Sequence, residues 1–215
     1  MIGKEILIFG AGGFGREVAW LIEDINKLEL TWNISGYIDN SSEKRNQLVN
    51  GYKVLGDSSI IKNLDKIIDV TVAVGDPKAR IAVVDELVNP FVKFPILIHP
   101  SVIMSKKVQI GFGTIICAGS IFTTDIKIGQ HVIVNLDCTI GHDAIIDDYC
   151  TLSPSVNISG NVTIGKAAFI GTGAHLINNV SVGENTVIGA GAVVTNNIPS
   201  NCTAVGIPAK PIKFH

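Results

Sequence analysis

His142 and Asp143 are the adjacent pair in this sequence best suited to acid–base chemistry. An imidazole gains and loses a proton near neutral pH, and a neighbouring carboxylate can orient the ring and raise its basicity. The pair therefore predicts a general base that removes a proton from an attacking nucleophile.

The other four histidines do not share this arrangement. His99 precedes Pro100 and is interpreted as part of a turn leading into the repeat region described below. His131 and His175 have no adjacent carboxylate and are interpreted as surface residues, and His215 is terminal. The sequence thus indicates one catalytic histidine.

A glycine-rich segment near the N-terminus has the context of a phosphate-binding turn. The run Glu5–Phe9 predicts a buried strand, and apolar residues at helical spacing predict a helix over 16–28. Between the two lie the candidate substrate-binding residues Gly10, Gly12, Gly13, Phe14 and Gly15. Backbone amides in such a loop can approach an anion closely, and the helix N-terminus adds partial positive charge.

The glycine loop has three interpretations. One is a tight turn that binds nothing, and the favoured one is a site for a nucleotide diphosphate. NAD is disfavoured, because the segment supplies only half of the usual dinucleotide-binding fold and no separate hydride-transfer domain follows.

The rest of residues 1–97 completes an α/β domain. Strands are predicted over 34–38 and 70–74, and a helix over 78–87. The first strand is followed by Asp39 and Asn40, and the second by Gly75 and Asp76, which are further candidate substrate-binding residues. An acidic side chain at this place can accept hydrogen bonds from a ribose or a base. The order of elements predicts a half-Rossmann domain.

Residues 98–200 contain a repeat of six residues. The first position of every hexad is apolar: Ile98, Met104, Ile110, Ile116, Phe122, Ile128, Val134, Ile140, Ile146, Leu152, Ile158, Ile164, Ile170, Leu176, Val182, Ile188 and Val194. A second inward position is mostly small: Ser120, Cys138, Ala144, Cys150, Ala168, Ala174, Thr186 and Ala192. This period belongs neither to a helix nor to a strand alone, and predicts a short strand plus a turn, repeated.

Glycine follows the apolar start in seven hexads: Gly111, Gly129, Gly141, Gly165, Gly171, Gly183 and Gly189. We expect these glycines to provide positive φ at the turns. The pattern resembles the left-handed parallel β-helix of the hexapeptide acyltransferases, in which three hexads form one triangular coil. The left-handed sense of the β-helix is taken from that resemblance. The resemblance also implies that residues eighteen apart stack about 4.8 Å from each other. Residues 201–215 are predicted to form a C-terminal tail.

Gly160 lies eighteen residues after His142 and is therefore expected one coil away from the imidazole. A backbone amide with no side chain beside a general base is suited to hold an oxyanion. The hexads contain no inserted loop, so the N-terminal domain is expected to shape the acceptor site.

Composition limits the other function classes. The formal net charge is −2, which gives no electrostatic footprint for nucleic acid, and no apolar run reaches the length of a membrane span. The four cysteines lack metal-ligand or disulfide spacing, and Cys138 and Cys150 fall at inward positions. We expect a cytoplasmic protein without a metal.

The whole chain resembles a family of sugar acetyltransferases. The motifs that carry the resemblance are Gly10–Gly15, Asp39, the uninterrupted hexads, Asn135 with His142–Asp143, and the tail from Gly206 to Lys210. The family includes sialic acid O-acetyltransferases and the N-acetyltransferases of UDP-4-amino sugars on the bacillosamine route. It implies a homotrimer with acetyl-CoA between neighbouring subunits and a nucleotide sugar in the N-terminal domain.

The resemblance also implies residue roles. His142 is the base, Asp143 supports it, the Gly160 amide holds the thioester carbonyl, and Asn135 contacts the sugar amine. Acetyl-CoA is expected along the later coils and the tail, at Thr151, Gly160, Thr172, Ala190 and Lys210. Phe14 departs from the bacillosamine-route enzymes, which carry a histidine there, so the nucleotide or sugar can differ.

Three functions follow as hypotheses. The first is acetyl-CoA-dependent N-acetylation of the 4-amino group of a nucleotide-linked sugar, with Asn135 beside the amine as the favouring feature. The second is O-acetylation of sialic acid or a related sugar on the same scaffold. The third is a non-catalytic nucleotide-sugar-binding protein, which the intact set of His142, Asp143 and Gly160 disfavours.

Overall fold

The computed structural model describes residues 3–215 and divides the chain into two compact units. Unit 1 ends at Pro100, and unit 2 comprises Ser101–His215.

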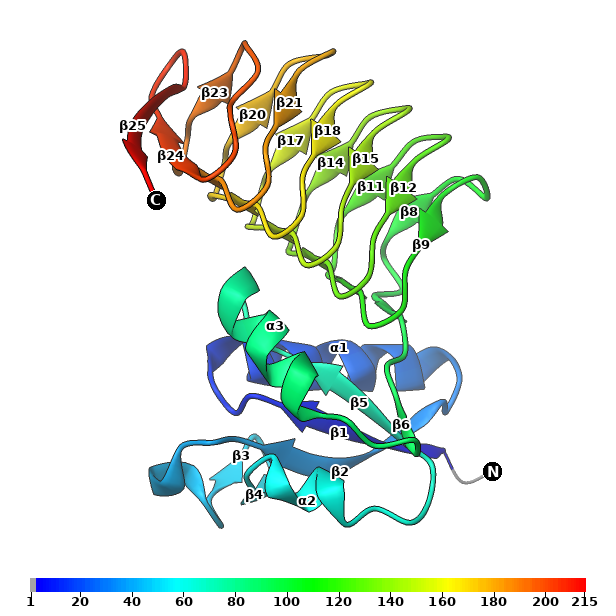
Figure 1. The fold of residues 1–215 in the computed structure, drawn as a ribbon. Coiled ribbons are helices and arrows are strands. Elements are labelled where there is room, and N and C mark those ends of the chain that lie inside the picture. Colours follow the sequence, from blue (N-terminus) through cyan, green and yellow to red (C-terminus); the bar gives the residue numbers. More distant parts are fainter. Residues whose placement is uncertain (1–2) are drawn as a thin grey trace. The chain divides into compact units, whose positions relative to one another are not determined.

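Unit 1 is a mostly parallel sheet with helices (Figure 1). Its elements are β1 (Lys4–Phe9), α1 (Gly13–Leu28), β2 (Trp32–Ile38), the 3-10 turn η1 (Ser42–Lys44), β3 (Leu48–Val49), β4 (Tyr52–Gly56), α2 (Ser59–Lys62), β5 (Ile68–Val72), α3 (Pro77–Glu86), β6 (Val92–Lys93) and β7 (Leu97–Ile98). Six of the strands form a sheet in the order β3-β4-β2-β1-β5-β6, in which the β3–β4 pair alone is antiparallel.

The core of unit 1 follows from the alternation of side chains along β1. Leu7 and Phe9 pack in a buried cluster with Ile61 of α2 and Leu87 beside the end of α3. The intervening side chains, Ile6 and Ile8, point to the opposite face and are fully buried. Both faces of the sheet are therefore covered, as expected for a parallel sheet.

Unit 1 contains the strands and helices expected of a half-Rossmann domain, together with one hairpin that was not predicted. β3 and β4 are joined by Asn50 and Gly51, both with positive φ. Asn-Gly between two short apolar runs is a strong hairpin signal, and it was overlooked.

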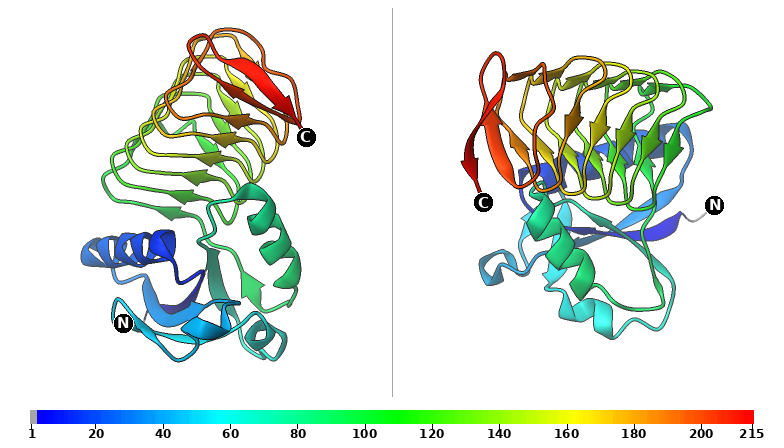
Figure 2. Two further views of the ribbon diagram at one scale, coloured as in Figure 1. Left: turned by 90° about the vertical axis from the view of Figure 1, so that its left-hand side faces the viewer. Right: turned by 45° about the horizontal axis from the view of Figure 1, so that its top comes forward.

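Unit 2 is a stack of triangular coils, each built from three short strands (Figures 1 and 2). The strands are β8 (Ile103–Met104), β9 (Gln109–Ile110), β10 (Ile115–Ile116), β11 (Ile121–Phe122), β12 (Lys127–Ile128), β13 (Ile133–Val134), β14 (Thr139–Ile140), β15 (Ile145–Ile146), β16 (Thr151–Leu152), β17 (Asn157–Ile158), β18 (Thr163–Ile164), β19 (Phe169–Ile170), β20 (His175–Leu176), β21 (Ser181–Val182), β22 (Val187–Ile188) and β23 (Val193–Val194). From β8 to β20, each strand pairs in parallel with the strand eighteen residues later, as in Thr139 with Asn157. This is the register that three hexads per coil requires.

The strands form three sheets along the stack. One contains β22-β19-β16-β13-β10, the second is β23-β20-β17-β14-β11-β8, and the third is β21-β18-β15-β12-β9. We name two of the three corners by a residue each. The Asn corner follows the first sheet and holds residues 117–119, 135–137, 153–155, 171–173 and 189–191. The His corner follows the second sheet and holds residues 105–107, 123–125, 141–143, 159–161 and 177–179.

The hexad starts fill the interior of the coils. From Ile116 to Val194, every start is at most 5% exposed. The small residues predicted at the second inward position are buried as well, at 0–1%. Among them, burial raises the pKa of the Cys138 thiol to about 12, so this cysteine acts as a core residue.

The glycines after the hexad starts do not adopt the positive φ that was predicted. They are needed because the next coil passes very close: a β-carbon on Gly141 would lie 2.6 Å from the amide nitrogen of Gly160. Positive φ occurs instead three residues after each start from Ile110 to Ile188, at Gly113, Gly119, Asp125, His131, Asp137, Asp143, Tyr149, Ser155, Asn161, Ala167, Gly173, Asn179, Asn185 and Gly191.

His131 is not a surface residue, contrary to the prediction. It is 1% exposed, and its ring stacks on Tyr149 with centroids 5.2 Å apart, while Phe112 meets it edge-on. His99 is also buried, with Nε2 3.0 Å from Oδ2 of Asp24. His175 is exposed, as predicted.

The last fifteen residues form a hairpin. β24 (Cys202–Val205) pairs in parallel with β22, and β25 (Lys210–Phe214) returns antiparallel to β24. All five residues of β25 are exposed. The tail therefore extends one sheet of the coil stack by two strands.

Candidate functional site

His142 and Asp143 form a hydrogen-bonded pair at the His corner. The imidazole Nδ1 lies 2.7 Å from Oδ2 of Asp143, whose backbone is held in the left-handed region with φ of 59°. A carboxylate can only accept at this contact, so Nδ1 carries the hydrogen, and in the neutral imidazole Nε2 then has the lone pair. Nε2 is therefore the nitrogen able to act as a base.

Gly160 lies directly against the imidazole. A β-carbon built on this residue would lie 2.5 Å from both Cε1 and Nε2 of His142, closer than any real side chain could come. Glycine is thus required if the ring is to keep its place. The coil spacing predicted this contact correctly.

The Gly160 amide is not used by the hydrogen bonds that join the coils. The amides of Ser159 and Asn161, on either side of it, donate to carbonyl oxygens of adjacent coils at 3.0 and 2.8 Å. No backbone acceptor for the Gly160 amide lies among residues 3–215. The lone pair of Nε2 and a donor free for a ligand therefore lie side by side.

The predicted site residues are divided between two corners of the coil. His142, Asp143 and Gly160 lie at the His corner, whereas Asn135 follows β13 and lies at the Asn corner. The side chain of Asn135 is half-buried, and its Oδ1 accepts a hydrogen bond from the Leu136 amide at 2.7 Å. One chain does not bring Asn135 and His142 together.

The expected acetyl-CoA residues other than Gly160 also belong to the sheet that ends at the Asn corner. Thr172 and Ala190 are exposed at that corner and do not stack above Gly160, contrary to the prediction. Thr151 lies on β16 of the same sheet and is only 4% exposed. Lys210 is exposed on β25.

The glycine loop of unit 1 contains glycines of two kinds. Gly10 has φ of 101°, and a β-carbon on Gly15 would collide with the carbonyl oxygen of Gly10, so the fold itself needs both. Around Gly12 and Gly13, in contrast, a β-carbon would meet nothing nearer than 4.0 Å. These two glycines leave open space over the start of α1.

The N-terminus of α1 is not capped within the protein. Its N-cap is Gly12, no side chain accepts from the first amides, and the first turn has no acidic residue. The first amides of a helix have no intrahelical acceptor and attract anions. Phe14 in this turn is half-buried.

Asp39 closes the glycine loop. Its carboxylate accepts hydrogen bonds from the Ala11 amide and the Lys44 ammonium, both at 2.8 Å, and from the Ser41 amide at 2.9 Å. Burial alone would raise the pKa of Asp39, but the contacts with Lys44 and the two amides outweigh it and hold this pKa below its ordinary value. Donors of the protein itself occupy most of the acceptor positions of this carboxylate, so few remain for the hydroxyl groups of a ribose.

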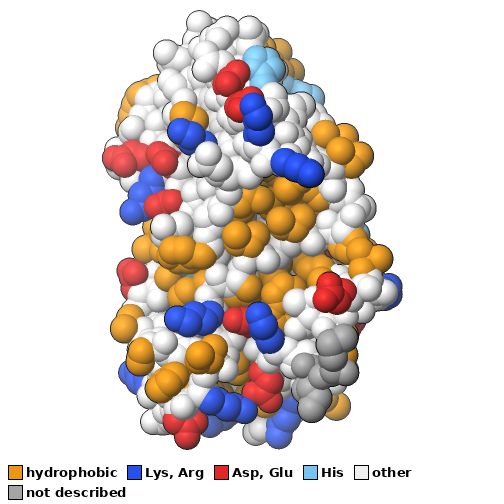
Figure 3. Space-filling model, turned by 90° about the vertical axis from the view of Figure 1, so that its right-hand side faces the viewer, with side chains coloured by type: hydrophobic (Ala, Val, Ile, Leu, Met, Phe, Trp, Pro, Cys, Tyr) orange, Lys and Arg blue, Asp and Glu red, His pale blue; other side chains and the backbone are white. Residues whose placement is uncertain are grey.

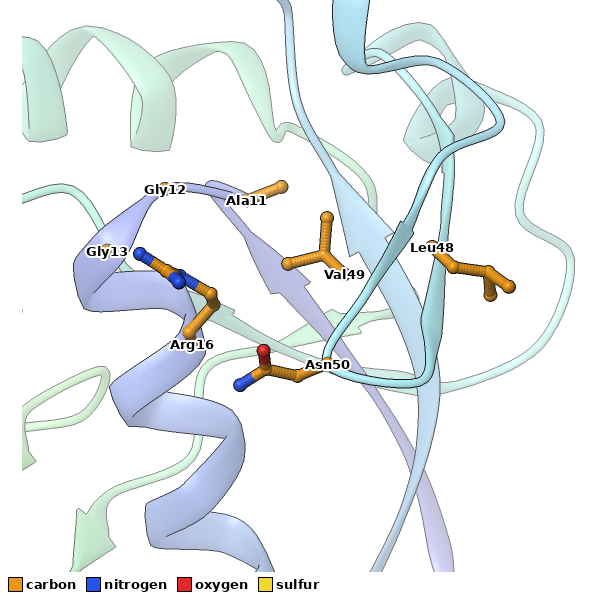
Figure 4. A pocket seen from close by; sticks show the side chains of 7 residues that line it. All are labelled: Ala11, Gly12, Gly13, Arg16, Leu48, Val49 and Asn50. Carbon is orange, nitrogen blue, oxygen red and sulfur yellow. The ribbon is translucent and has the colours of Figure 1, made fainter.

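A pocket of about 350 Å³ opens beside the glycine loop. It is lined by Ala11, Gly12, Gly13, Arg16, Leu48, Val49 and Asn50. Figure 4 shows Arg16 and Val49 extending into the space between the loop and the β3–β4 turn, while Leu48 points away. Arg16 and the hairpin were not among the predicted site features, although the sequence contains a cation at the start of the helix and the Asn50-Gly51 pair.

Three further predicted residues have other partners in unit 1. Asn40 donates to Glu86 at 3.3 Å and accepts from the Ser58 amide, on the wall of a different pocket. Asp76 is the N-cap of α3, where it accepts from the Ala79 amide at 2.7 Å. The Gly75 carbonyl accepts from the buried Arg80 guanidinium. The structure does not bring them to the glycine-loop pocket.

Other kinds of site are not supported within residues 3–215. No helix in that range is long and apolar enough to cross a membrane, and no three acidic, histidine or cysteine side chains there form a metal-binding group. On the face seen in Figure 3, acidic and basic side chains of the described residues are interspersed with apolar ones.

Comparison with known proteins gives consistent matches to both units. The family model of the PglD N-terminal domain matches residues 5–87, and the model of the bacterial transferase hexapeptide (six repeats) matches residues 161–196. The GDP-perosamine N-acetyltransferase of Escherichia coli O157:H7 is 31% identical over 170 residues, which are 78% of this chain and 75% of that relative.

Two solved structures resemble nearly the whole chain. The acetyltransferase domain of PglB from Neisseria gonorrhoeae FA1090 in complex with acetyl coenzyme A has a TM-score of 0.88 and 32% identity, covering 98% of this chain and all of that one. PerB from Caulobacter crescentus in complex with CoA and GDP-perosamine has a TM-score of 0.86 and 29% identity, covering 99% of each chain. The predicted fold, a half-Rossmann domain followed by a left-handed parallel β-helix, is confirmed.

Proposed function

The chain belongs to the family of hexapeptide-repeat N-acetyltransferases of amino sugars, and on that premise we propose that it acetylates the 4-amino group of a nucleotide-linked sugar. The observation that carries the proposal is the contact of His142 with Gly160. It places a basic nitrogen oriented by Asp143 beside a backbone amide that no coil contact uses.

Each of these groups has one task in the reaction. Acetyl-CoA supplies a thioester, which a free amine attacks and an ammonium does not. Nε2 of His142 takes a proton from the nitrogen as it attacks, and Asp143 stabilises the imidazolium that results. The Gly160 amide donates to the acetyl carbonyl oxygen as that oxygen gains negative charge. As the tetrahedral intermediate collapses, the C–S bond breaks and CoA leaves as the thiol, taking the proton that His142 removed from the nitrogen.

The glycine-loop pocket is the proposed site for the nucleotide diphosphate. The uncapped start of α1 and the open space over Gly12 and Gly13 suit a phosphate, and Arg16 adds a cation. Asp39 serves here as a positioning residue, because it holds Ala11 and Lys44 rather than the ligand.

A homotrimer is proposed because one chain leaves the site incomplete. The side chains of His142 and Asp143 are 63% and 60% exposed, and Asn135, Thr172 and Ala190 lie at another corner. Packing three coil stacks side by side would set the Asn corner of one chain against the His corner of its neighbour. We further propose a cytoplasmic enzyme of glycan biosynthesis.

Thiol release from acetyl-CoA tests the reaction directly. The acceptor panel contains GDP-perosamine, UDP- and dTDP-linked 4-amino sugars and free sialic acid. We expect release with at least one nucleotide-linked amino sugar, and its loss in His142→Ala. Release with sialic acid alone would establish O-acetylation instead, and no release with any acceptor would refute the proposal.

Light scattering tests the assembly independently. We expect the mass of three chains. A monomer that still turns over would show that the His corner needs no neighbouring chain.

A further inference from the structure

Gly141 directly precedes the proposed base and packs against the peptide unit that contains the proposed oxyanion donor. A β-carbon on Gly141 would lie 2.6 Å from the nitrogen of Gly160, 2.7 Å from the carbonyl carbon of Ser159 and 3.1 Å from the Cα of Gly160. All three atoms belong to the peptide unit that joins residues 159 and 160. The bare backbone of Gly141 is therefore the surface against which this unit lies.

Two hydrogen bonds between adjacent coils hold the peptide unit in this place. On the side before it, the amide of Gly141 donates to the carbonyl oxygen of Ile158 at 2.8 Å. On the side after it, the amide of Asn161 donates to the carbonyl oxygen of His142 at 2.8 Å. The peptide unit cannot move away from Gly141 without straining one of these bonds.

A side chain at residue 141 would displace the donor amide from its place beside the imidazole. Ordinary contacts between atoms that are not bonded begin near 3.4 Å, so Gly141→Ala requires the gap to the Gly160 nitrogen to widen by about 0.8 Å. The group that must yield is hydrogen-bonded backbone, and not the free end of a side chain. An oxyanion donor is effective because it already points to the place where negative charge develops, so a displacement of this size should impair it.

The same close approach occurs at a corner that has no catalytic group. Gly165 also follows a hexad start, and it lies at the corner that holds residues 165–167. A β-carbon on Gly165 would lie 2.7 Å from the amide nitrogen of Glu184. The packing requirement is therefore common to both glycines, but the amide that Gly141 contacts is the one beside His142.

We infer that Gly141 is a positioning residue for the acetyl transfer, because its lack of a side chain sets the place of the Gly160 amide relative to His142. The inference rests on the proposed function, since it takes this amide as the donor to the acetyl carbonyl oxygen. Gly141 therefore acts on the chemical step and on the polarisation of the thioester carbonyl, and not on the affinity for the acceptor.

Gly141→Ala and Gly165→Ala form a matched pair of variants of the assembled full-length protein. Each adds one methyl group that meets a backbone nitrogen at nearly the same distance, so their melting temperatures should fall to a similar extent. Steady-state kinetics use the nucleotide-linked amino sugar with which wild type releases most thiol. We expect kcat to fall about 10- to 100-fold in Gly141→Ala, as for a catalytic group displaced by about 1 Å, with little change in either KM. Gly165→Ala should keep the wild-type kinetics.

Isotope-edited infrared spectroscopy measures the donor without any turnover. The probe is acetyl-CoA with a heavy carbon isotope in the thioester carbonyl, bound in the absence of an acceptor. A hydrogen bond to the carbonyl oxygen lowers its stretching frequency, so we expect a lower frequency on wild type than in buffer. Gly141→Ala should lose most of this shift, and Gly165→Ala should keep it.

Either a wild-type kcat or a wild-type carbonyl frequency in Gly141→Ala would overturn the inference, as would an equal fall of kcat in Gly165→Ala. The absence of a frequency shift on wild type would overturn it without any variant. Failure of Gly141→Ala to fold would also count against it, because the contact would then be a requirement of the coil alone.

Failure of the proposed reaction would look different. A frequency shift that depends on Gly141, in a protein that releases no thiol with any acceptor, would refute the acetyl transfer and leave the placement of the amide standing.

Discussion

Gly160 lies one coil after His142, so close that a β-carbon at residue 160 would lie 2.5 Å from Nε2 of the imidazole. The base and the proposed oxyanion donor are therefore in direct contact and cannot be changed independently. Gly160→Ala should displace the ring while leaving the coil folded, because the group that must move is the free end of a side chain.

The expected effect of Gly160→Ala is a fall in kcat of about 10- to 100-fold, the size expected when a catalytic group is displaced by about 1 Å. The melting temperature should stay close to that of wild type. Asn178→Ala, at the same corner one coil further on, is the control. Full activity in Gly160→Ala would exclude this contact from the mechanism.

Removing the base should affect the chemical step rather than binding. His142→Ala should lower kcat by about two to four orders of magnitude and leave acetyl-CoA affinity unchanged. Asp143→Asn should lower kcat less, because it removes only the carboxylate that orients the ring and stabilises its charge through Nδ1. The exposed His175→Ala is the control in steady-state kinetics. If His142→Ala kept more than about a third of the wild-type rate, the loss would be too small for a general base.

The two kinds of glycine in the loop should respond differently to substitution. Gly13→Val fills the open space over α1 and should weaken nucleotide-sugar binding while acetyl-CoA binding and stability are retained. Gly15→Ala meets the Gly10 carbonyl and should lower stability by about 1–3 kcal/mol, as overpacking does. Calorimetry and thermal unfolding separate the effects. Unchanged nucleotide binding in Gly13→Val would place the acceptor site elsewhere.

Asp39 should make stability depend on pH at the acidic end. Because its pKa is lowered on folding, its ionised form stabilises the protein above the ordinary value near 3.9, and this contribution is lost as pH falls through the lowered pKa. Lys44→Met removes one of the contacts that lower the pKa of Asp39. The substitution should lower the free energy of unfolding by about 0.5–1 kcal/mol at pH 7 and leave it unchanged at strongly acidic pH.

Urea unfolding at several pH values measures this difference. Lys53→Met, an exposed lysine on β4, is the control and should match wild type throughout. A difference between Lys44→Met and wild type that stayed constant down to strongly acidic pH would show that Asp39 is not its source.

The C-terminal hairpin is the proposed end of the acetyl-CoA site. Lys210→Ala should raise the KM for acetyl-CoA by up to about fivefold, which is the change expected when one exposed ion pair is lost. The KM for the sugar should stay unchanged. Lys213→Ala on the same strand is the charge-matched control. Deletion of residues 206–215 should have a larger effect with the same selectivity, provided that the proposed trimer still forms. Equal effects on both substrates would make the tail structural.

Much of the fold was predictable because its causes are local. The period of six specifies which side chains fill the coil, and every start from Ile116 onward is buried as that period requires. The strand, glycine loop and helix from Lys4 to Leu28 follow from adjacent residues. The contact of Gly160 with His142 followed from the period of six together with the three hexads per coil that the family resemblance implies.

Other features depended on residues that are distant in sequence. His131 is buried because Tyr149 of the next coil covers it, and nothing beside His131 in the sequence indicates this. Asp39 accepts a hydrogen bond from the amide of Ala11, twenty-eight residues earlier, and nothing beside Asp39 in the sequence indicates this structural contact.

The sequence by itself determined the repeat, the order of the elements and the pairing of His142 with Asp143 as the candidate base, since each depends on short-range periodicity or on adjacent residues. The tertiary structure decided that Asn135 and His142 lie at different corners of the coil and that the β3–β4 hairpin forms one wall of the glycine-loop pocket. Those arrangements come from where the coils turn and how strands pair, which brings together side chains that the chain itself keeps apart.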